Sequence, residues 1–379
     1  MRINYLLFAL LTTIGITFSS CIKDEADTME SDITSATIED ANKFLLTTPT
    51  ITNNNVFFRL LPDVDEREFA PLFKLSDGAT ITPENGSKQN FSKGPVQYVI
   101  TSQDGKWKKA YNVSFLTNTF ITHYDFENVH TEVTEGPEGQ YHEFFEVLPD
   151  GMTKYDWASG NQGYNMLAET LLEDDQELSP AVYPTFSIND GYKGKGVKMV
   201  TRSTGPLGSM MGSPIAAGNL YLGTFNFTFP AIKSTRFGIP YSTGINMPKT
   251  LKGYYKYKAG KDFTITSKEG SALTKDAWDA YAIIFEKGDN PKKEFLAGDH
   301  KFLDPRMVAI ARLDDKNRVE TDEWTKFEIP FQMVEGKTFD PKANYMIAIV
   351  FSASVEGDIF NGAVGSTLQI DEVELDFDK

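Results

Sequence analysis

The sequence predicts an all-β protein of two domains, a small β-sandwich followed by a larger jelly-roll β-sandwich. Aromatic residues make up 13% of the 379 residues. Short runs rich in aromatic and β-branched side chains are separated by clusters of Gly, Pro, Asn and Asp, which is the pattern of strands joined by turns. Apolar and polar residues alternate within several runs, as in strands with one buried face. The length exceeds what a single hydrophobic core usually serves, so two domains are expected.

The chain opens with the pattern of a secretory signal peptide, which we place at residues 1–20. One positive charge at Arg2 precedes a mostly apolar run from Ile3 to Phe18, and two small serines follow the run. The run is shorter than the roughly 20 residues that a membrane-spanning helix needs. The sequence therefore predicts export rather than a retained membrane helix.

Cys21 is the only cysteine of the chain and stands directly after the predicted signal peptide. The segment Phe-Ser-Ser-Cys resembles the lipobox of bacterial lipoproteins, whose cysteine becomes the acylated first residue. Lys23-Asp24-Glu25 resembles the export signal of Bacteroidetes lipoproteins. These resemblances imply a lipidated tether over residues 21–31 and a protein anchored in the outer membrane that faces the cell exterior. The alternatives are a free cysteine near an ordinary cleavage site and a solvated acidic tether.

The composition excludes several classes of function. With a single cysteine, the chain forms no internal disulfide and holds no cysteine-ligated metal. The formal net charge is −16 and becomes −17 when residues 1–20 are removed, because Arg2 is their only charged residue. A chain this acidic repels nucleic acid phosphates, so nucleic acid is excluded as a partner.

Residues 32–117 are predicted to form the small β-sandwich. Four or more short antiparallel strands in about 85 residues are typical of that fold. Asp104 and Gly105 are a strong hairpin-turn signal between the last two runs. The stretch YVITSQDGKWKKAYNVSF resembles immunoglobulin-like N-terminal modules of Bacteroidetes surface lipoproteins, which implies an immunoglobulin-like spacer. The strand-like runs lie at 55–61, 70–75, 96–101 and 109–115.

Residues 118–379 are predicted to form the jelly roll, with about ten strands and few helices. One short helix is expected within 165–178, before Pro180. Alternation is clear in 251–258, where every second side chain is a lysine or Tyr254. The strand-like runs lie at 123–129, 141–147, 196–202, 219–229, 235–241, 251–260, 280–288, 307–313, 324–334, 345–354 and 368–378.

Several long segments of this second part, in the same order, resemble one family. They include YDFEN at 124–128, WASGNQGYNML at 157–167, YPTFSINDGYKGKGVKMV at 183–200 and FNGAVGSTLQIDEVEL at 360–375. This part is identified as a member of the putative carbohydrate metabolism domain of Bacteroidetes lipoproteins. The resemblance implies a jelly roll like those of carbohydrate-binding modules and a place among glycan-utilisation proteins.

Two carboxylates near the two ends of the jelly roll predict a structural calcium site. In many carbohydrate-binding jelly rolls the first and last strands lie side by side and hold a calcium ion, which prefers six to eight oxygen ligands. Ile370 is out of phase with the other apolar residues of the last strand, which suggests a bulge that re-aims Asp371. We expect Glu127 and Asp371 as ligands. The alternative is that these acids are only the solvated face of a strand.

A sugar site needs an exposed aromatic ring for stacking and amide or carboxylate groups that bind hydroxyls. Trp157, Asn161 and Tyr164 fit a loop that presents such a platform. Trp278, between two aspartates, and Tyr254, on the lysine-bearing face of its strand, are further candidates. The alternative for each aromatic residue is that it packs in the core.

The expected function is glycan capture by a cell-surface lipoprotein, with a polysaccharide or oligosaccharide as partner. A glycoside hydrolase on the same fold is the first alternative, and a structural or adhesive protein of the fimbrial type is the second. No metalloprotease, serine-hydrolase or phosphate-loop motif is present. Carboxylate pairs suited to glycoside hydrolysis can always be chosen from 53 acidic residues, so no catalytic residue is predicted.

Overall fold

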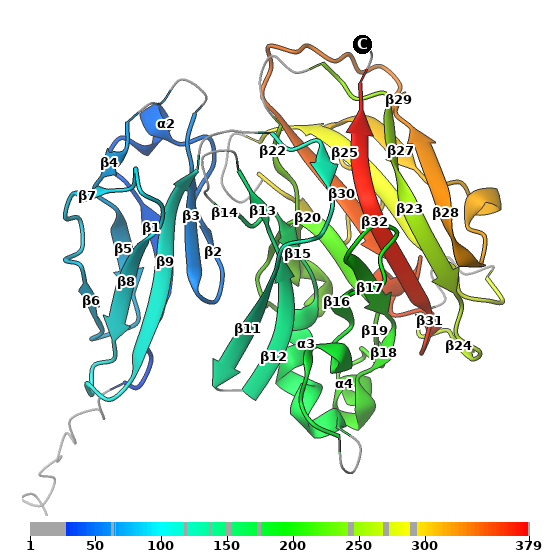
Figure 1. Cartoon of the computed structure of the whole chain (residues 1–379), viewed down its shortest axis with the longest axis horizontal. Coiled ribbons are helices and arrows are strands. Elements are labelled where there is room, and N and C mark those ends of the chain that lie inside the picture. Colours follow the sequence, from blue (N-terminus) through cyan, green and yellow to red (C-terminus); the bar gives the residue numbers. More distant parts are fainter. Residues whose placement is uncertain are drawn as a thin grey trace, which may run out of the picture.

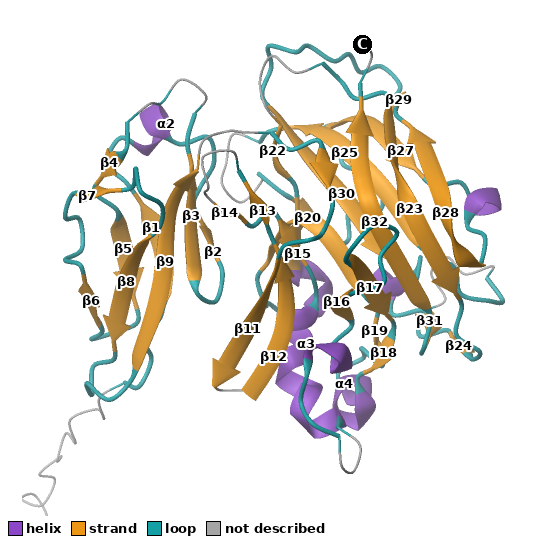
Figure 2. Cartoon of the chain, viewed as in Figure 1, coloured by secondary structure: helices purple, strands orange, loops and turns teal. Residues whose placement is uncertain are grey.

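The computed structural model describes residues 28–377 except for short segments at 62–63, 65, 117–119, 136–137, 149–152, 173–175, 242–245, 268–272 and 289–293. The predicted signal peptide, Cys21 and Lys23-Asp24-Glu25 lie outside the described residues, as does the predicted domain boundary at 117–118. Strands dominate the chain, so the all-β prediction is confirmed (Figure 2). In the part that is described, no helix is long and apolar enough to cross a membrane.

The first domain is a small β-sandwich, coloured blue to cyan in Figure 1. Its main sheet has the order β2-β3-β9-β8-β6, and the pairs β1-β5 and β4-β7 complete it. The pair β3-β9 is parallel, whereas the other pairs are antiparallel. The elements are β1 (Ile33–Thr37), α2 (Ala41–Phe44), β2 (Thr50–Ile51), β3 (Asn55–Arg59), β4 (Glu68–Phe69), β5 (Leu72–Leu75), β6 (Thr80–Thr82), β7 (Gln89–Asn90), β8 (Val96–Thr101) and β9 (Lys108–Leu116).

Stacked phenylalanines form the centre of the first core. The ring centroids of Phe58 and Phe115 are 4.4 Å apart, and those of Phe69 and Phe115 are 4.0 Å apart. The predicted hairpin turn lies between β8 and β9, where Gly105 has φ 72° and donates to the carbonyl of Ser102. A positive φ is strained for most residues, which explains why glycine stands there.

The second domain packs two large sheets face to face, as a jelly roll does (Figure 1). The six-stranded sheet has the order β16-β17-β32-β23-β28, with β10 paired to β32. The first and last strands of the domain therefore lie side by side, as predicted. The strands are β10 (His123–Tyr124), β16 (Thr185–Ile188), β17 (Gly196–Val200), β23 (Thr250–Lys258), β28 (Thr321–Pro330) and β32 (Thr367–Asp376).

The nine-stranded sheet has the order β26-β21-β20-β30-β25-β27-β29, with β15 paired to β20 and β22 paired to β30. Its strands are β15 (Trp157–Ala158), β20 (Asn219–Phe225), β21 (Thr235–Phe237), β22 (Ile239–Tyr241), β25 (Asp279–Glu286), β26 (Leu296–Ala297), β27 (Met307–Arg312), β29 (Gln332–Met333) and β30 (Tyr345–Ser352). Apolar side chains of both large sheets interdigitate between them, with Trp278 fully buried at the centre.

The outer face of the nine-stranded sheet is also apolar. Tyr221, Tyr281, Ile283 and Phe285 form a second cluster there, separate from the core between the sheets. The segment 295–302 contributes Phe295, Leu296 and Phe302 to this cluster. These strands are therefore buried on both faces, which accounts for their nearly continuous apolar sequences.

Smaller elements surround the two sheets. The predicted helix within 165–178 is misplaced, because α3 begins four residues earlier and a 3₁₀ turn at Glu169–Leu171 ends it. The remaining elements are β11 (Val129–Glu135), β12 (Glu138–Phe144), β13 (Glu146–Val147), β14 (Thr153–Lys154), α3 (Asn161–Ala168), β18 (Arg202–Ser203), α4 (Gly205–Met210), β19 (Ile215–Ala216), β24 (Phe263–Thr264), β31 (Gly362–Ala363) and further 3₁₀ turns at Pro180–Val182, Ala231–Ser234, Asp315–Asn317 and Gly357–Ile359.

The predicted strand 123–129 is wrong in its second half. Phe126 has φ 55°, a left-handed conformation that breaks a strand, and its ring is buried between the sheets. The chain therefore leaves β10 after Tyr124 and enters the β11–β12 hairpin at Val129. The predicted bulge near Asp371 is confirmed, because the β23–β32 register shifts there and Glu372 has φ 48°.

Buried polar contacts join the two domains. Arg59 of β3 forms an ion pair with Asp156 at 2.5 Å, and Lys154 contacts the other oxygen of that carboxylate at 2.9 Å. The amides of Asn53 and Asn54 donate to the buried Glu132 at 2.6 and 2.7 Å. A buried charge is costly without a partner, so this network fixes how β3 meets the β11–β14 region.

Candidate functional site

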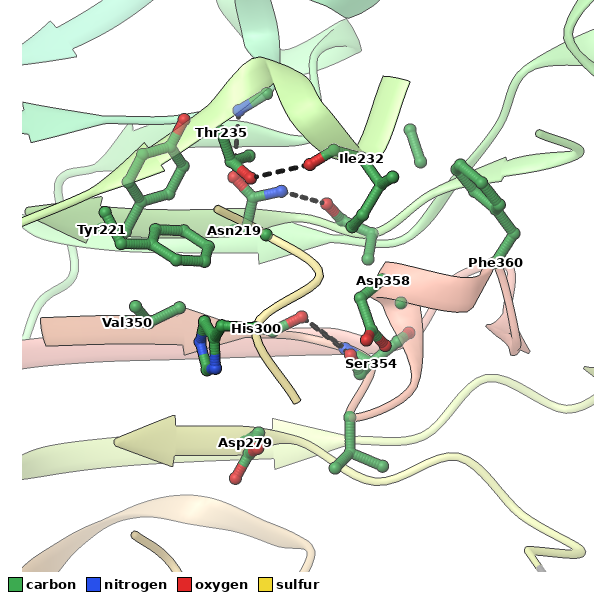
Figure 3. A pocket seen from close by; sticks show the side chains of 18 of the residues that line it. Asn219, Tyr221, Ile232, Thr235, Asp279, His300, Val350, Ser354, Asp358 and Phe360 are labelled. Carbon is green, nitrogen blue, oxygen red and sulfur yellow. Dashed lines mark hydrogen bonds between the residues drawn. The ribbon is translucent and has the colours of Figure 1, made fainter. Parts of the chain in front are cut away.

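A cleft of about 220 Å³ opens on the outer face of the nine-stranded sheet. Figure 3 shows how its walls come from distant parts of the chain: Asn219 and Tyr221 lie on β20, Val350 on β30 and Asp279 on β25, while His300 and Asp358 come from connecting segments. The cleft is small beside the roughly 300–1,000 Å³ of sites for drug-sized ligands. Its size suits a single ring-shaped unit.

The alternation of side chains along β25 determines which of its residues face the cleft. Successive side chains of a strand point to opposite faces. Trp278, Ala280 and Ala282 join the core between the sheets, whereas Tyr281 joins the outer cluster and Asp279 lines the cleft. The alternation that directs Ala280 and Ala282 into the core therefore also directs Asp279 and Tyr281 toward the cleft.

Three aromatic rings form one corner of the cleft. Tyr281 and Phe302 meet edge to face with centroids 4.9 Å apart, and His300 and Phe302 do the same at 4.9 Å. The edge-to-face arrangement is the favoured one for aromatic pairs. Phe225 and Phe360 line the cleft as well, and both are half-buried.

An ion-pair cluster stiffens this corner. Asp279 contacts Arg312 at 3.1 Å through one oxygen and Arg318 at 2.8 Å through the other. The guanidinium of Arg312 lies 4.0 Å from the centroid of Phe302, a cation–π contact. Asp279 is thus engaged on both oxygens and acts as a support for the aromatic corner.

His300 is held as a neutral ring. Burial, helped by the charge of Arg312, lowers the pKa of His300 to about 4. Its Nδ1 accepts the backbone N–H of Phe302 at 2.9 Å, so the proton of the neutral ring is on Nε2. That nitrogen lies 3.4 Å from the hydroxyl of Tyr281. The cleft therefore presents a neutral N–H donor beside a phenol.

The backbone around the cleft is strained. Among the described residues six that are not glycine have a positive φ, and three of them, Lys301, Phe302 and Phe360, line the cleft. Such conformations cost of order 1–3 kcal/mol each and persist where surrounding structure enforces them. Two of the three carry the aromatic rings of the walls, so the strain serves their placement.

A further carboxylate stands at the mouth of the cleft. Asp358 lies in the 3₁₀ turn after β30, and its side chain reaches solvent. The protein packed around it, and then the neighbouring Glu356, raise its pKa above the ordinary value. Two acidic side chains line the cleft, Asp279 and Asp358. Asp279 is paired with two arginines, whereas no such pair is formed by Asp358 among the described residues.

Three of the predicted sugar-binding residues are buried instead. Trp157 is 6% exposed and packs edge to face on Tyr124, with centroids 5.0 Å apart. Asn161 is 1% exposed, and its amide pairs with both backbone groups of Thr185. Tyr164 is buried and donates to the carbonyl of Ser203. The loop predicted as a platform is therefore part of the packing between α3 and the sheets.

The other two candidates, Trp278 and Tyr254, differ in their exposure to solvent. Trp278 is fully buried and stacks on Tyr255 with centroids 4.2 Å apart, so neither of its faces is open to a ligand. Tyr254 is half-buried on the outer face of the six-stranded sheet and stacks on Tyr192 at 3.6 Å. None of the five predicted residues lines the cleft, although Gly160, next to Asn161, does.

The two predicted calcium ligands lie around one turn and bind its backbone. Glu127 accepts the N–H of Lys195 at 2.8 Å, and Asp371 accepts the N–H of Lys193 at 2.8 Å. Burial raises the pKa of Asp371 to about 6. Across the described part of the chain, no group of three or more His, Cys, Asp or Glu is placed to hold a metal. A calcium ion would compete with these N–H donors for the same oxygens.

Sequence reasoning missed the residues of the cleft because they are far apart in the chain. His300 and Phe302 belong to GDHKFLDPR, a stretch without a motif, and Phe360 follows a turn. One signal was available. β25 begins with alternating Asp279 and Tyr281, and a charged residue beside an aromatic one on an otherwise apolar strand indicates a site at the strand end.

Family comparisons agree with the two-domain architecture. Residues 125–376 match the family described as "Putative carbohydrate metabolism domain", and residues 33–114 match the family described as "SGBP, N-terminal". The first match covers most of the second domain, including every strand that lines the cleft.

Two solved structures of Bacteroides proteins are similar to this chain. A putative glycoside hydrolase from Bacteroides thetaiotaomicron shares 42% identity, with a TM-score of 0.80, over 94% of this chain and 99% of that one. A putative glycoside hydrolase from Bacteroides vulgatus shares 36% identity, with a TM-score of 0.57, over 67% of this chain and 97% of that one. No curated protein shows significant similarity to the chain.

Proposed function

The chain belongs to the family of the putative carbohydrate metabolism domain, and from this premise we propose that it captures glycan at the cell surface by binding a sugar unit in the cleft. The observation that carries the proposal is the cleft itself. It combines rigid aromatic walls with a few fixed polar groups, which is the composition of sugar and small-molecule sites. Both features lie on strands and connecting segments of the matched domain.

The cleft supplies the two kinds of contact that a sugar ring requires. Phe360 and Phe225 are half-buried walls against which the C–H face of a ring can pack. Asp358, at the mouth, can accept hydrogen bonds from sugar hydroxyls. The ring of His300 is held by its contacts with Phe302 and Tyr281, and the ion pairs of Asp279 stiffen the same corner. The N–H donor of His300 is therefore in position before a ligand arrives, which lowers the entropic cost of binding.

Glycan binding is tested with the exported chain and its Phe360→Ala variant. Arrays of plant and host glycans identify a ligand, and calorimetry then gives its affinity. Removing one aromatic wall is expected to cost about 1–2 kcal/mol, roughly a 5- to 30-fold loss of affinity.

Trp107→Ala is the matched control. Trp107 is 49% exposed but lies on the β8–β9 hairpin of the first domain, so its loss should leave the affinity unchanged. Absence of binding to any glycan, or equal losses in both variants, would contradict the cleft as the site.

Hydrolysis is the second candidate, because the two similar solved structures are described as putative glycoside hydrolases. The raised pKa of Asp358 is a property of general acids. Its would-be partner Asp279 is engaged by two arginines, which favours binding over catalysis. Release of reducing ends from a bound glycan, abolished in Asp358→Asn, would reverse this order.

We further propose that Cys21 carries a lipid anchor in the outer membrane and that the first domain is a spacer. The match to the family described as "SGBP, N-terminal", a surface glycan-binding protein module, supports an external location. Labelling of cells with a tagged fatty acid should mark the wild type and not a Cys21→Ala variant. Labelling of the Cys21→Ala variant would exclude Cys21 as the site of lipid attachment.

A further inference from the structure

A row of five side chains crosses the outer face of the six-stranded sheet, on the side of the sandwich away from the cleft. The row consists of Phe186 on β16, Lys198 on β17, Gln369 on β32, Lys256 on β23 and Trp324 on β28. An aromatic ring closes each end, and an amide separates two lysines in the middle. We call this set the lysine row.

The strand register places these residues side by side. Phe186 is directly opposite Lys198, Lys198 opposite Gln369, and Gln369 opposite Lys256. Residues directly opposite in neighbouring antiparallel strands share a face of the sheet. Their chain neighbours, among them Val197 and Ile370, are in the core, so the row faces outward.

The two lysines lie against the terminal rings. Lys256 Nζ is 5.2 Å from the centroid of Trp324, and Lys198 Nζ is 5.9 Å from that of Phe186. These are cation–π distances. All five side chains of the row are half-buried rather than flexible at the surface, so ligand binding would restrict little further motion.

The charges of the row are uncompensated. Lys198 and Lys256 have no carboxylate partner among the residues that the structure describes. Two other lysines of the same face are paired: Lys326 contacts Glu328 at 2.9 Å, and Lys252 contacts Asp376 at 3.1 Å. In a chain with a net charge of −16, two lysines without a carboxylate partner on one face of a sheet mark a place for an anion.

A stacked tyrosine pair extends the surface beside the row. Tyr254 lies two residues before Lys256 on the same face of β23, and Tyr192 covers it with centroids 3.6 Å apart and planes within 8°. Tyr192 is 46% exposed. The turn that carries Tyr192 is held by Glu127 and Asp371, so these two carboxylates are occupied by backbone N–H groups.

We propose that the lysine row binds an extended anionic polysaccharide in which every second sugar carries a carboxylate. Neighbouring strands are about 4.8 Å apart, so the backbones of Lys198 and Lys256, two strands apart, are separated by about 10 Å, and the backbones of the whole row span about 19 Å. The shorter separation is close to the length of two extended sugar units. Each lysine then pairs with one carboxylate, the rings of Trp324 and Phe186 pack on uncharged sugars, and Gln369 binds a hydroxyl between them.

The test uses the exported chain and oligosaccharides of hyaluronan, which alternates a uronic acid with a neutral sugar. We expect measurable binding that weakens as salt is raised, because the ion pairs are at a surface. The double variant Lys198→Gln, Lys256→Gln should lose at least tenfold in affinity, and Trp324→Ala several-fold. Lys326→Gln, whose lysine is paired on the same face, is the matched control and should bind as the wild type does.

Several outcomes would overturn the proposal. They are absence of hyaluronan binding, an equal loss in the Lys326→Gln control, and equal binding of polygalacturonate, which carries a carboxylate on every sugar. Chondroitin sulfate tests whether the row binds carboxylate or sulfate. Tighter binding of chondroitin sulfate than of hyaluronan would assign the row to sulfate and overturn the proposal. The site is independent of the cleft, so Phe360→Ala should leave hyaluronan binding unchanged even if the cleft binds nothing.

Discussion

Glu146 shows how much a single side chain near the domain interface can depend on pH. It lies on β13, and burial, followed by the charges of Asp125 and Asp156, raises its pKa to about 8. A carboxyl whose pKa is raised in the folded protein stabilises the fold while it is protonated. This contribution is fully present below about pH 4.5 and is lost as the pH rises through about 8.

A Glu146→Gln variant should therefore change the pH dependence of stability. The free energy of unfolding of the wild type, relative to the variant, is expected to fall by about 2–4 kcal/mol between pH 5 and pH 9. Urea unfolding at several pH values measures this difference. Glu138→Gln, an exposed glutamate of the adjacent hairpin, should show no such trend. A difference that stays constant with pH would show that Glu146 is ionised throughout.

At the scale of single residues, the sequence pointed to the right region of β25 but to the wrong residue for the cleft. Trp278 and Asp279 are neighbours, and a functional role was predicted for the first, whereas the second lines the cleft. Both fit a strand, but the pattern does not show which face of β25 meets the core, because both faces are covered. Only the packing of the opposite sheet decides it.

The turn between β16 and β17 is an element whose shape depends on two distant carboxylates. Gly194 has φ 70°, and a Cβ there would overlap the carboxylate of Glu127. The bulge that re-aims Asp371 was predicted from Ile370. The role of the two carboxylates in the turn was not predicted: a metal site was expected, and in the structure Glu127 and Asp371 accept hydrogen bonds from the backbone of the turn.

Comparing two glycines separates contact from backbone strain. Gly194 and Gly212 have similar φ values, 70° and 78°, but a Cβ on Gly212 would meet no atom within 4 Å. Gly212→Ala is expected to cost about 1–2 kcal/mol for its backbone alone. Gly194→Ala should cost a further 1–3 kcal/mol for the overlap with Glu127. Thermal and urea unfolding measure both, and equal costs would mean that the carboxylate moves away freely.

Elements with a simple alternating pattern were predicted closely. The predicted run 96–101 has the same bounds as β8, and 109–115 differs from β9 by one residue at each end. Elements that depend on tertiary contacts were not. α3 begins at Asn161 because its amide binds the backbone of Thr185, a partner that local sequence does not reveal.

At the scale of the whole molecule, the all-β class and the order of two sandwiches could be predicted because turn signals and alternation are local. The cleft could not, since it joins segments around residues 219, 279, 300 and 358. The contact between the domains could not be predicted either. Arg59 and Asp156 are far apart in the chain, and their pairing depends on burial from both sides.

The position of β32 has a consequence for the order in which the molecule is assembled. It pairs with β23 on one edge and with β17 and β10 on the other, so it is central in its sheet although it is the last strand that the structure describes. Such pairings over long sequence separations form slowly. Because a chain is synthesised from its N-terminus, it can complete the first sandwich early. The second sandwich must wait, with the edges of β17 and β23 unpaired, until residues 367–376 arrive. Folding therefore passes through a state that needs protection from aggregation.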